Sequence, residues 1–288
     1  MLYSTIWIEV IKTNKHQSVA IMRIKTLFIG IIVFLSTPLF SQDFQHYFDE
    51  LNLKGSTTIY NLNDNSWVYT DSLDANRETL PASTFKIMNS LIILEEKAVN
   101  DENTIIQWDG KERDFYGYKM ASWNKDTNLR SAFKNSTIWF YVEMTKDINR
   151  KKYKRYLKKS EYGNQVLSEK GIDFWNYGGF GVTPKNQIEF LVKLYKNELP
   201  FSKRTLEKVK EVMVSKKNED YIFRDKTGWA KKDGIDIGWW IGYLQTIDNV
   251  YFFATRVEKN IDDKNPSFSR SRKAITINIL KDLNIIKK

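Results

Sequence analysis

The segment "PASTFKIMNSLIILEEKAV", residues 81–99, places a serine three residues before a lysine at the start of an apolar run. A proline is favourable in the first turn of a helix, and the apolar side chains that follow cover more than one helical face. We therefore expect a buried helix over residues 81–99. A separation of three residues puts Ser83 and Lys86 on the same face of that helix. The same spacing also occurs at Ser122–Lys125 and Ser131–Lys134, so these four-residue patterns alone do not define a site.

Strand patterns lie toward both ends of the chain. Residues 56–69 contain two β-rich runs around Asn63-Asp64-Asn65, and residues 236–258 read as a hairpin that turns at 246–249. The middle of the chain, about 100–215, is predicted to be mostly helical, with one helix starting at Thr183-Pro184. The last eighteen residues are predicted to form another helix. We therefore expect an α+β fold with a central antiparallel sheet from both chain ends, flanked by helices, and a helical subdomain.

The composition excludes several kinds of chemistry. The chain has 288 residues and no cysteine, which rules out disulfides, a cysteine nucleophile and thiolate metal ligands. Its two histidines, His16 and His46, both lie near the N-terminus, so a Ser-His-Asp triad or a histidine-rich metal site is not expected. The "GGFG" at 178–181 lacks the strand and lysine of a phosphate-binding loop. We expect no metal, and any catalytic base must be a lysine or a carboxylate.

The N-terminal region resembles a secretory leader. A basic stretch begins at Met22 and is followed by a largely apolar segment over 27–40, which fits a signal peptide at 22–41. Residues 1–21 are then an upstream extension, and residues 42–288 form the catalytic domain. The alternative is an uncleaved membrane anchor. We expect an exported, periplasmic protein with no stable membrane anchor once the signal is removed, which N-terminal sequencing would test.

The net charge of +10 is concentrated partly in "KDINRKKYKRYLKK", residues 146–159. Nucleic-acid binding is one interpretation of such a patch. We favour a helix with Tyr153, Tyr156 and Leu157 facing inward and lysines in water, because export separates the protein from nucleic acid. No nucleic-acid partner is expected, and the oligomeric state is left open.

Ser83 is the strongest of the three serine candidates. The N-terminus of a helix offers unpaired backbone N–H groups and the positive end of the helix dipole, where an oxyanion can develop. The apolar run should bury Lys86, and burial favours the neutral amine that can accept a proton. Ser122 and Ser131 lie in polar stretches without such burial.

Two further motifs support Ser83. Serine β-lactamases and penicillin-binding proteins combine Ser-x-x-Lys with Lys-Thr-Gly, which occurs here at Lys226-Thr227-Gly228. A strand carrying this motif beside the nucleophile places a cation and a hydroxyl where a substrate carboxylate can bind, and Gly228 allows close approach to the backbone. Between the two motifs stands "YGN" at 162–164.

With these motifs the sequence resembles the class D, oxacillinase-type, serine β-lactamases. The resemblance runs from about Phe48 to the C-terminus. The segments that carry it are "STFK" (83–86), "STI" (136–138), "YGN" (162–164), "GIDFW" (171–175), "KTGW" (226–229), "GWWIGY" (238–243) and "SRKAI" (271–275). It implies a serine β-lactamase/penicillin-binding-protein-like fold and a small-molecule β-lactam substrate.

The resemblance also implies roles for individual catalytic residues. Ser83 would be acylated by the β-lactam. Lys86 would be carboxylated on its amine by carbon dioxide, with no other cofactor, and would act as the general base. Trp175 would hold that carboxylate through its indole N–H, and Ser136 would pass a proton to the leaving nitrogen.

A second set of implied residues binds the substrate. Lys226 and Thr227, with Arg272, would hold the substrate carboxylate, although Arg270 is a near neighbour. The backbone N–H groups of Ser83 and Trp229 would form the oxyanion hole.

One position departs from the family pattern. The family usually has Ser-x-Val where this chain has Ser136-Thr137-Ile138. The resemblance implies that this side chain lines the lysine pocket, so the additional methylene of Ile138 is expected to affect deacylation and substrate range.

Three alternatives remain at the sequence level. A β-lactam sensor domain would share the motifs and stay acylated. A penicillin-binding transpeptidase would act on peptidoglycan. A basic binding protein without chemistry would leave the motif order unexplained. Turnover of nitrocefin separates these possibilities.

Overall fold

The computed structural model describes residues 44–287. The predicted upstream extension (1–21) and signal peptide (22–41) lie outside the described residues. The described residues all belong to one compact unit. Within the described part of the chain, no helix is both long enough and apolar enough to cross a membrane.

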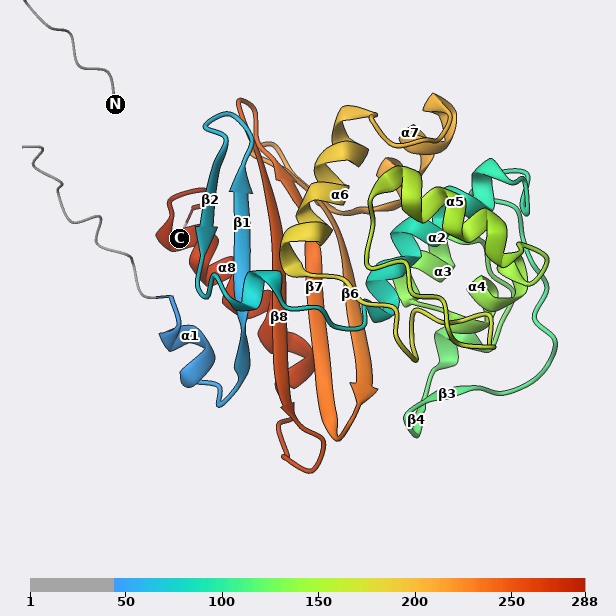
Figure 1. Ribbon diagram of the computed structural model, residues 1–288, viewed down its shortest axis with the longest axis horizontal. Helices are drawn as coiled ribbons and strands as arrows, with labels where there is room; N and C mark the ends of the chain where they lie inside the picture. The colour runs from blue at the N-terminus through green and yellow to red at the C-terminus, as the bar shows by residue number, and fades with distance from the viewer. Residues whose placement is uncertain (1–43, 288) are drawn as a thin grey trace, which may run out of the picture. The chain divides into compact units, whose positions relative to one another are not determined.

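A six-stranded antiparallel sheet forms the centre of this unit (Figure 1). Its order is β2-β1-β8-β7-β6-β5. The strands are β1 (Lys54–Asn61), β2 (Ser66–Tyr69), β5 (Val214–Lys217), β6 (Ile222–Lys232), β7 (Ile235–Gln245) and β8 (Val250–Asn260). Because β1 pairs with β8, strands from opposite ends of the chain lie side by side, as the sequence predicts.

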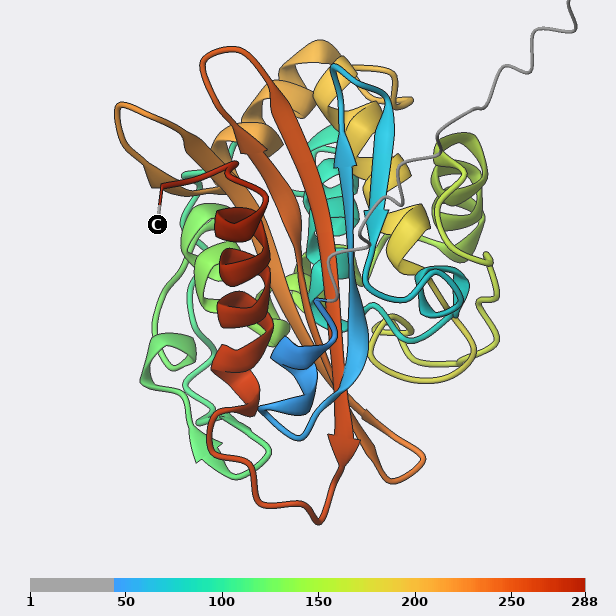
Figure 2. The same cartoon turned by 90° about the vertical axis from the view of Figure 1, so that its left-hand side faces the viewer.

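The middle strands are buried on both faces. On β7, Trp239 and Ile241 join the core on one side of the sheet, while Trp240 and Leu244 join the core on the other. This follows from the alternation of side chains along a strand. Helix α6 (Pro184–Lys196) covers one face and α8 (Phe268–Asp282) covers the opposite face (Figure 2).

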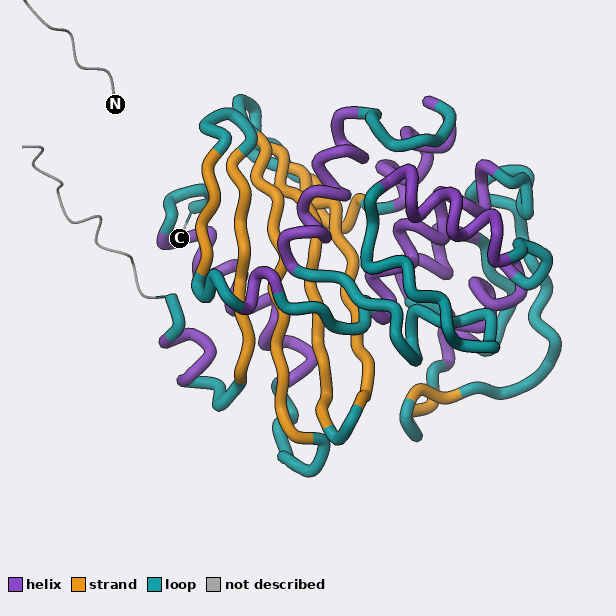
Figure 3. Tube along the Cα trace, in the orientation of Figure 1, coloured by secondary structure: helices purple, strands orange, loops and turns teal. Residues whose placement is uncertain are grey.

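The remaining helices gather beside the β5–β6 edge of the sheet (Figures 1 and 3). They are α2 (Lys86–Glu95), α3 (Leu129–Asn135), α4 (Ile138–Thr145), α5 (Arg150–Ser160) and α7 (Lys203–Val212), while the short α1 (His46–Asp49) precedes β1. The 3₁₀ segments are η1 (Asp74–Asn76), η2 (Ala82–Phe85) and η3 (Ala121–Trp123). A two-stranded hairpin, β3 (Asp114–Phe115) and β4 (Tyr118–Lys119), completes the fold.

Three sequence predictions need correction. The helix expected over 81–99 is a 3₁₀ turn followed by α2, and it ends early because Lys97 adopts a left-handed conformation (φ 56°) that stops the helix. The C-terminal helix occupies 268–282, since Asn284 is also left-handed (φ 56°). The middle region is less helical than predicted, because residues 97–128 and 161–183 are mainly loops.

Helix α5 matches the prediction for the basic segment. Tyr153, Tyr156 and Leu157 are buried, whereas the lysines of this helix lie toward solvent. Tyr156 donates a hydrogen bond of 2.6 Å to Glu96, a residue that follows α2. The aromatic face therefore attaches α5 to the C-terminal end of α2.

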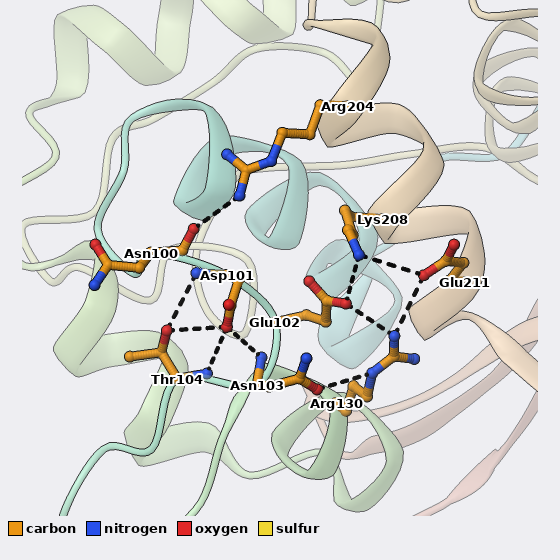
Figure 4. A network of polar contacts seen from close by, with 9 residues as sticks. All are labelled: Asn100, Asp101, Glu102, Asn103, Thr104, Arg130, Arg204, Lys208 and Glu211. Carbon is orange, nitrogen blue, oxygen red and sulfur yellow. Dashed lines mark hydrogen bonds and ion pairs between the residues drawn. The ribbon is translucent and has the colours of Figure 1, made fainter.

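A network of ion pairs and hydrogen bonds links α3 to α7 (Figure 4). Glu102, whose side chain is 1% exposed, pairs at 2.9 Å with both Arg130 of α3 and Lys208 of α7. Glu211 also pairs with Arg130, at 3.3 Å. The network holds in place the helix whose C-terminal residue precedes Ser136.

Candidate active site

The turn that contains Ser83 has an unusual backbone. Ala82 has a φ of 51°, and its N–H donates a 3.1 Å hydrogen bond to the carbonyl oxygen of Trp175. The turn brings Ser83 to the wall of a cleft just ahead of α2. Lys86 is the first residue of α2, and its Nζ donates a 2.9 Å hydrogen bond to Ser83 Oγ. The serine and lysine therefore meet as their spacing predicts.

Lys86 is fully buried. Burial lowers the pKa of Lys86 to about 7, although the nearby Asp173 carboxylate opposes this effect. A substantial fraction of the amine is therefore neutral at neutral pH, and a neutral amine can accept the proton of Ser83.

The indole of Trp175 packs against Phe85, which lies between Ser83 and Lys86 in the sequence. Trp175 stacks on Phe85 with ring centroids 5.4 Å apart, and its Nε1 is buried without a hydrogen-bond acceptor in the described part of the chain. Since buried N–H groups are usually satisfied, this donor indicates a missing acceptor. The family's lysine carboxylate would supply one, so the residues present fit that group.

Ser136 and Lys226 form a second pair across the cleft. Ser136 caps the C-terminus of α3 in a left-handed conformation (φ 54°). Lys226 Nζ donates a 2.5 Å hydrogen bond to Ser136 Oγ and a 3.0 Å bond to the carbonyl of Thr227. Burial lowers the pKa of Lys226, and positive charge on Lys86 and Arg272 lowers it further.

Gly228 lets β6 approach the nucleophile turn. A Cβ atom at this position would lie 2.8 Å from the carbonyl oxygen of Pro81 and 3.1 Å from Thr84 Cγ2. The contact with the Pro81 oxygen is too short for a Cβ atom and the contact with Thr84 is tight, so the strand or the turn would have to move. The glycine of the Lys-Thr-Gly motif is therefore required by the packing of strand against turn.

Arg272 reaches the same strand from α8. It is 6% exposed, lines the cleft and donates a 2.5 Å hydrogen bond to the carbonyl of Gly228. Burial lowers the pKa of Arg272 to about 10. Arg270, by contrast, is exposed and is not among the cleft residues.

These elements surround a cleft of about 460 Å³. Ser83, Ser136, Thr227, Gly228, Trp229 and Arg272 contribute to its walls. Sequence analysis missed the aromatic part of the lining, which comprises Phe115, Tyr118, Trp123 and Phe268. The density of aromatic residues around Gly117, in "FYGYKM", was the available signal.

The rival serines occupy different surroundings. Ser122 lies in η3 and Ser131 in α3, and their lysines, Lys125 and Lys134, are exposed. Neither lysine therefore experiences the desolvation that acts on Lys86. Ile138 begins α4 and lines a separate cleft that also includes Asp109 and Arg113. Its expected effect on deacylation stays a prediction.

No group of three or more potential metal-ligating side chains occurs within residues 44–287. Arg272 is the charged side chain among the residues that line the cleft, and Lys226 stands behind the lining residue Ser136, to which it donates a hydrogen bond. Such a site suits an anionic substrate.

Comparisons with known proteins agree with this geometry. Residues 51–281 match the penicillin binding protein transpeptidase domain. β-Lactamase OXA-48 of Klebsiella pneumoniae is 38% identical over 240 residues, which cover 83% of this chain and 87% of that protein. The probable β-lactamase YbxI of Bacillus subtilis is 38% identical over 224 residues, covering 77% of this chain and 78% of that protein.

A solved structure gives the same result. The class D β-lactamase from Sebaldella termitidis superposes with a TM-score of 0.81 at 41% identity, covering 85% of this chain and 96% of that one. The fold thus defines a penicillin-binding transpeptidase-type domain. Within that group, the chain belongs to the class D serine β-lactamases. The predicted class and fold are confirmed, and the sensor and transpeptidase alternatives are not favoured.

Proposed function

We propose that the protein hydrolyses β-lactams through an acyl-enzyme on Ser83. The observation that carries this proposal is the 2.9 Å hydrogen bond between the fully buried Lys86 amine and Ser83 Oγ. In acylation, Ser83 Oγ attacks the lactam carbonyl carbon and its proton passes to the base at Lys86. The carbonyl oxygen becomes an oxyanion, which the backbone N–H groups of Ser83 and Trp229 would stabilise.

Breaking the lactam C–N bond requires a proton on the leaving nitrogen. Ser136 is the proposed donor, and Lys226 is its proposed source of protons. The 2.5 Å bond between Lys226 Nζ and Ser136 Oγ supports this relay. In deacylation, water attacks the ester carbon, the base takes a proton from that water, and Ser83 recovers its hydrogen.

We propose that the site orients the substrate by binding the carboxylate that β-lactams carry. Lys226, Thr227 and Arg272 are its proposed partners, and Gly228 lets the substrate approach the strand. The burial of Arg272 at the cleft wall supports it over the exposed Arg270.

We also propose that Lys86 is carboxylated on Nζ when carbon dioxide is available. The lowered pKa of Lys86 provides the neutral amine that this modification requires, and the unpaired Trp175 Nε1 provides a donor to hold it. The modification supplies an anionic base beside Ser83. Trp175 acts by fixing the position of the base, and the surrounding apolar residues exclude competing water.

Export to the periplasm remains part of the proposal. It rests on the apolar segment over 27–40 after the basic start at Met22, with cleavage near residue 41 and a catalytic domain over 42–288. N-terminal sequencing of the secreted protein tests the boundary, and an unprocessed N-terminus would indicate an anchor.

Nitrocefin kinetics test the proposed activity. Steady hydrolysis over many turnovers is expected, and Ser83→Ala should abolish it. A single burst equal to the enzyme concentration would instead indicate a protein that is acylated and does not turn over. No reaction at all would overturn the acyl-enzyme proposal.

A further inference from the structure

A chain of buried hydrogen bonds joins the tyrosine of the "YGN" segment to the turn that carries Ser83. Tyr162 donates its hydroxyl hydrogen to Gln187 Oε1 at 2.7 Å, and Gln187 Nε2 donates to Thr84 Oγ1 at 2.9 Å. Thr84 Oγ1 in turn donates to the carbonyl oxygen of Pro81 at 2.7 Å. We call these four residues the Gln187 chain.

The side chains of the Gln187 chain are isolated from water. Tyr162, Thr84 and Gln187 each have 0% exposure. Gln187 lies on α6, and the other buried residues of this helix are apolar. A glutamine in this environment loses its hydration, so it must recover that free energy through its two hydrogen bonds.

Each link of the Gln187 chain has a fixed direction. Thr84 has a single hydroxyl hydrogen, which it uses on Pro81, so its oxygen is left to accept from Gln187. Gln187 meets this need with its amide N–H and accepts from Tyr162 with its amide oxygen. A side-chain amide donates at one end and accepts at the other without carrying charge.

Strand β6 confines the same turn from another direction. A Cβ on Gly228 would come within 3.1 Å of Thr84 Cγ2 and 2.8 Å of the Pro81 oxygen. The turn thus lies between the strand that carries Trp229 and the amide of Gln187. Its position relative to β6 sets the separation between the backbone N–H groups of Ser83 and Trp229.

We propose that Gln187 is a positioning residue for the reaction, fixing the turn so that Ser83 faces both its base and the oxyanion site. This inference rests on the proposed acyl-enzyme function. Gln187 would not contact substrate and would act through Thr84. Because small displacements of a reacting group lower rates steeply, loss of the chain should slow acylation more than it weakens initial substrate binding.

The first test compares two substitutions of Thr84 by pre-steady-state kinetics with nitrocefin. Thr84→Val removes the hydroxyl and retains the shape, and it should lower the acylation rate constant about 10- to 100-fold. Thr84→Ser retains the hydroxyl and should restore most of that loss. The dissociation constant of the non-covalent complex should change little, because Lys226 and Arg272 lie on other elements.

Thr255→Val is the matched control. Thr255 is also fully buried and bonded through its hydroxyl to Thr57 at 2.8 Å and to Thr276 at 2.6 Å, on the β1–β8–α8 side of the sheet. The Thr255→Val variant should be less stable than the wild type but should be acylated at the wild-type rate. Equal effects of Thr84→Val and Thr255→Val on acylation would overturn the proposal.

A second test uses Gln187→Met, alone and combined with Thr84→Val. Since both changes break the same link, the double variant should be no slower than the slower single variant. Tyr162→Phe, which removes only the distal bond, provides a milder variant if either change prevents folding, and it should slow acylation to a smaller extent. The inference would be refuted if the double variant were slowed by the product of the two single effects on the acylation rate constant. Normal acylation in both Gln187→Met and Tyr162→Phe would also refute it.

The wild-type protein separates this inference from the proposed function. If wild-type protein is not acylated on Ser83, the proposed function fails. If wild-type acylation proceeds and the Gln187 chain variants match it, only the positioning role fails.

Discussion

At the scale of single residues, the protonation of Lys86 governs the expected pH dependence. Burial lowers its pKa to about 7 from 10.5, so protonation below neutrality removes the base. Activity should therefore fall on acidification through pH ~7. If carboxylation contributes, degassed buffer should deepen this loss and bicarbonate should reverse it. Rates of β-lactam hydrolysis across pH 5–8, with and without bicarbonate, measure both effects.

Trp175→Phe isolates the indole N–H in that experiment. It keeps an aromatic ring to stack on Phe85 and removes the unpaired donor. The variant should need more bicarbonate than the wild type for half-maximal activity. Turnover that is independent of bicarbonate in both proteins, with no carbamate signal from labelled carbon dioxide, would leave the free amine of Lys86 as the base.

The buried amine of Lys86 should lower the free energy of unfolding of the protein. Because its folded pKa lies below its unfolded value, the penalty is present in full below pH ~7 and is relieved as the pH rises toward 10.5. Lys86→Met should therefore raise the free energy of unfolding by about 1–2 kcal/mol near pH 6 while abolishing activity. Urea denaturation measures this, and a less stable Lys86→Met protein would contradict the assignment.

The two arginines of α8 offer a matched pair of substitutions. Arg272→Ala removes a buried cation from the cleft wall and should lower kcat/KM by about 10- to 100-fold, the effect of losing a charge-assisted hydrogen bond of about 1.5–3 kcal/mol. Arg270→Ala should leave it nearly unchanged, since Arg270 is exposed. If Arg270→Ala lowers kcat/KM and Arg272→Ala does not, Arg270 is the residue that binds the substrate carboxylate.

At the scale of secondary-structure elements, the site depends on how closely β6 packs against the nucleophile turn. Gly228→Ala would place a Cβ 2.8 Å from the Pro81 oxygen, so either the strand or the turn must shift. We expect a loss of about 1–3 kcal/mol in stability and a larger fractional loss of kcat. Thermal denaturation and nitrocefin kinetics provide the two readouts, and unaltered kcat would show that this spacing is not critical.

Sequence patterns predicted the elements unevenly. The β-rich runs at 236–245 and 250–258, with the turn at 246–249 between them, located the C-terminal hairpin. Thr183 was correctly placed at the start of α6, where it caps the helix. The end of α2 was missed, because the apolar pattern continues to Val99 while the left-handed Lys97 stops the helix. Such a backbone conformation depends on local hydrogen bonds that periodicity does not report.

The residues of the site were also predicted only in part. Ser83 and Lys86 were predictable because they are close in sequence and their contact follows from helical geometry. The Gln187–Thr84 contact spans 103 positions. Helical spacing puts Gln187 on the face of α6 that carries Leu191 and Leu194, but that spacing does not indicate which residue it contacts. Long-range pairing within the helical region determines such contacts.

At the scale of the whole molecule, the Glu102 network attaches the α3 side of the cleft to α7. Burial alone would raise the pKa of Glu102, but hydrogen bonds from Lys208 and Arg130 lower it below its usual value. The stability it contributes is therefore present above pH ~4.5 and is lost as the pH falls through the folded pKa. Glu102→Gln should reduce stability by about 1–3 kcal/mol at pH 7 and by less in acid.

Glu143→Gln is the control for that prediction. Glu143 pairs with Lys146 on the surface, where both side chains are about half exposed, so its loss should change stability by less than about 1 kcal/mol. Equal shifts in the unfolding midpoint for Glu102→Gln and Glu143→Gln would show that burial of the network has no energetic consequence.

The most direct measurement is the site of covalent attachment. The intact protein should be mixed with a penicillin, quenched in acid within the lifetime of the acyl-enzyme, digested and analysed by mass spectrometry. A single adduct on the peptide that contains Ser83 is the predicted result, and Ser83→Ala should abolish it. An adduct on the peptide of Ser122 or Ser131, or one that persists in Ser83→Ala, would contradict the account.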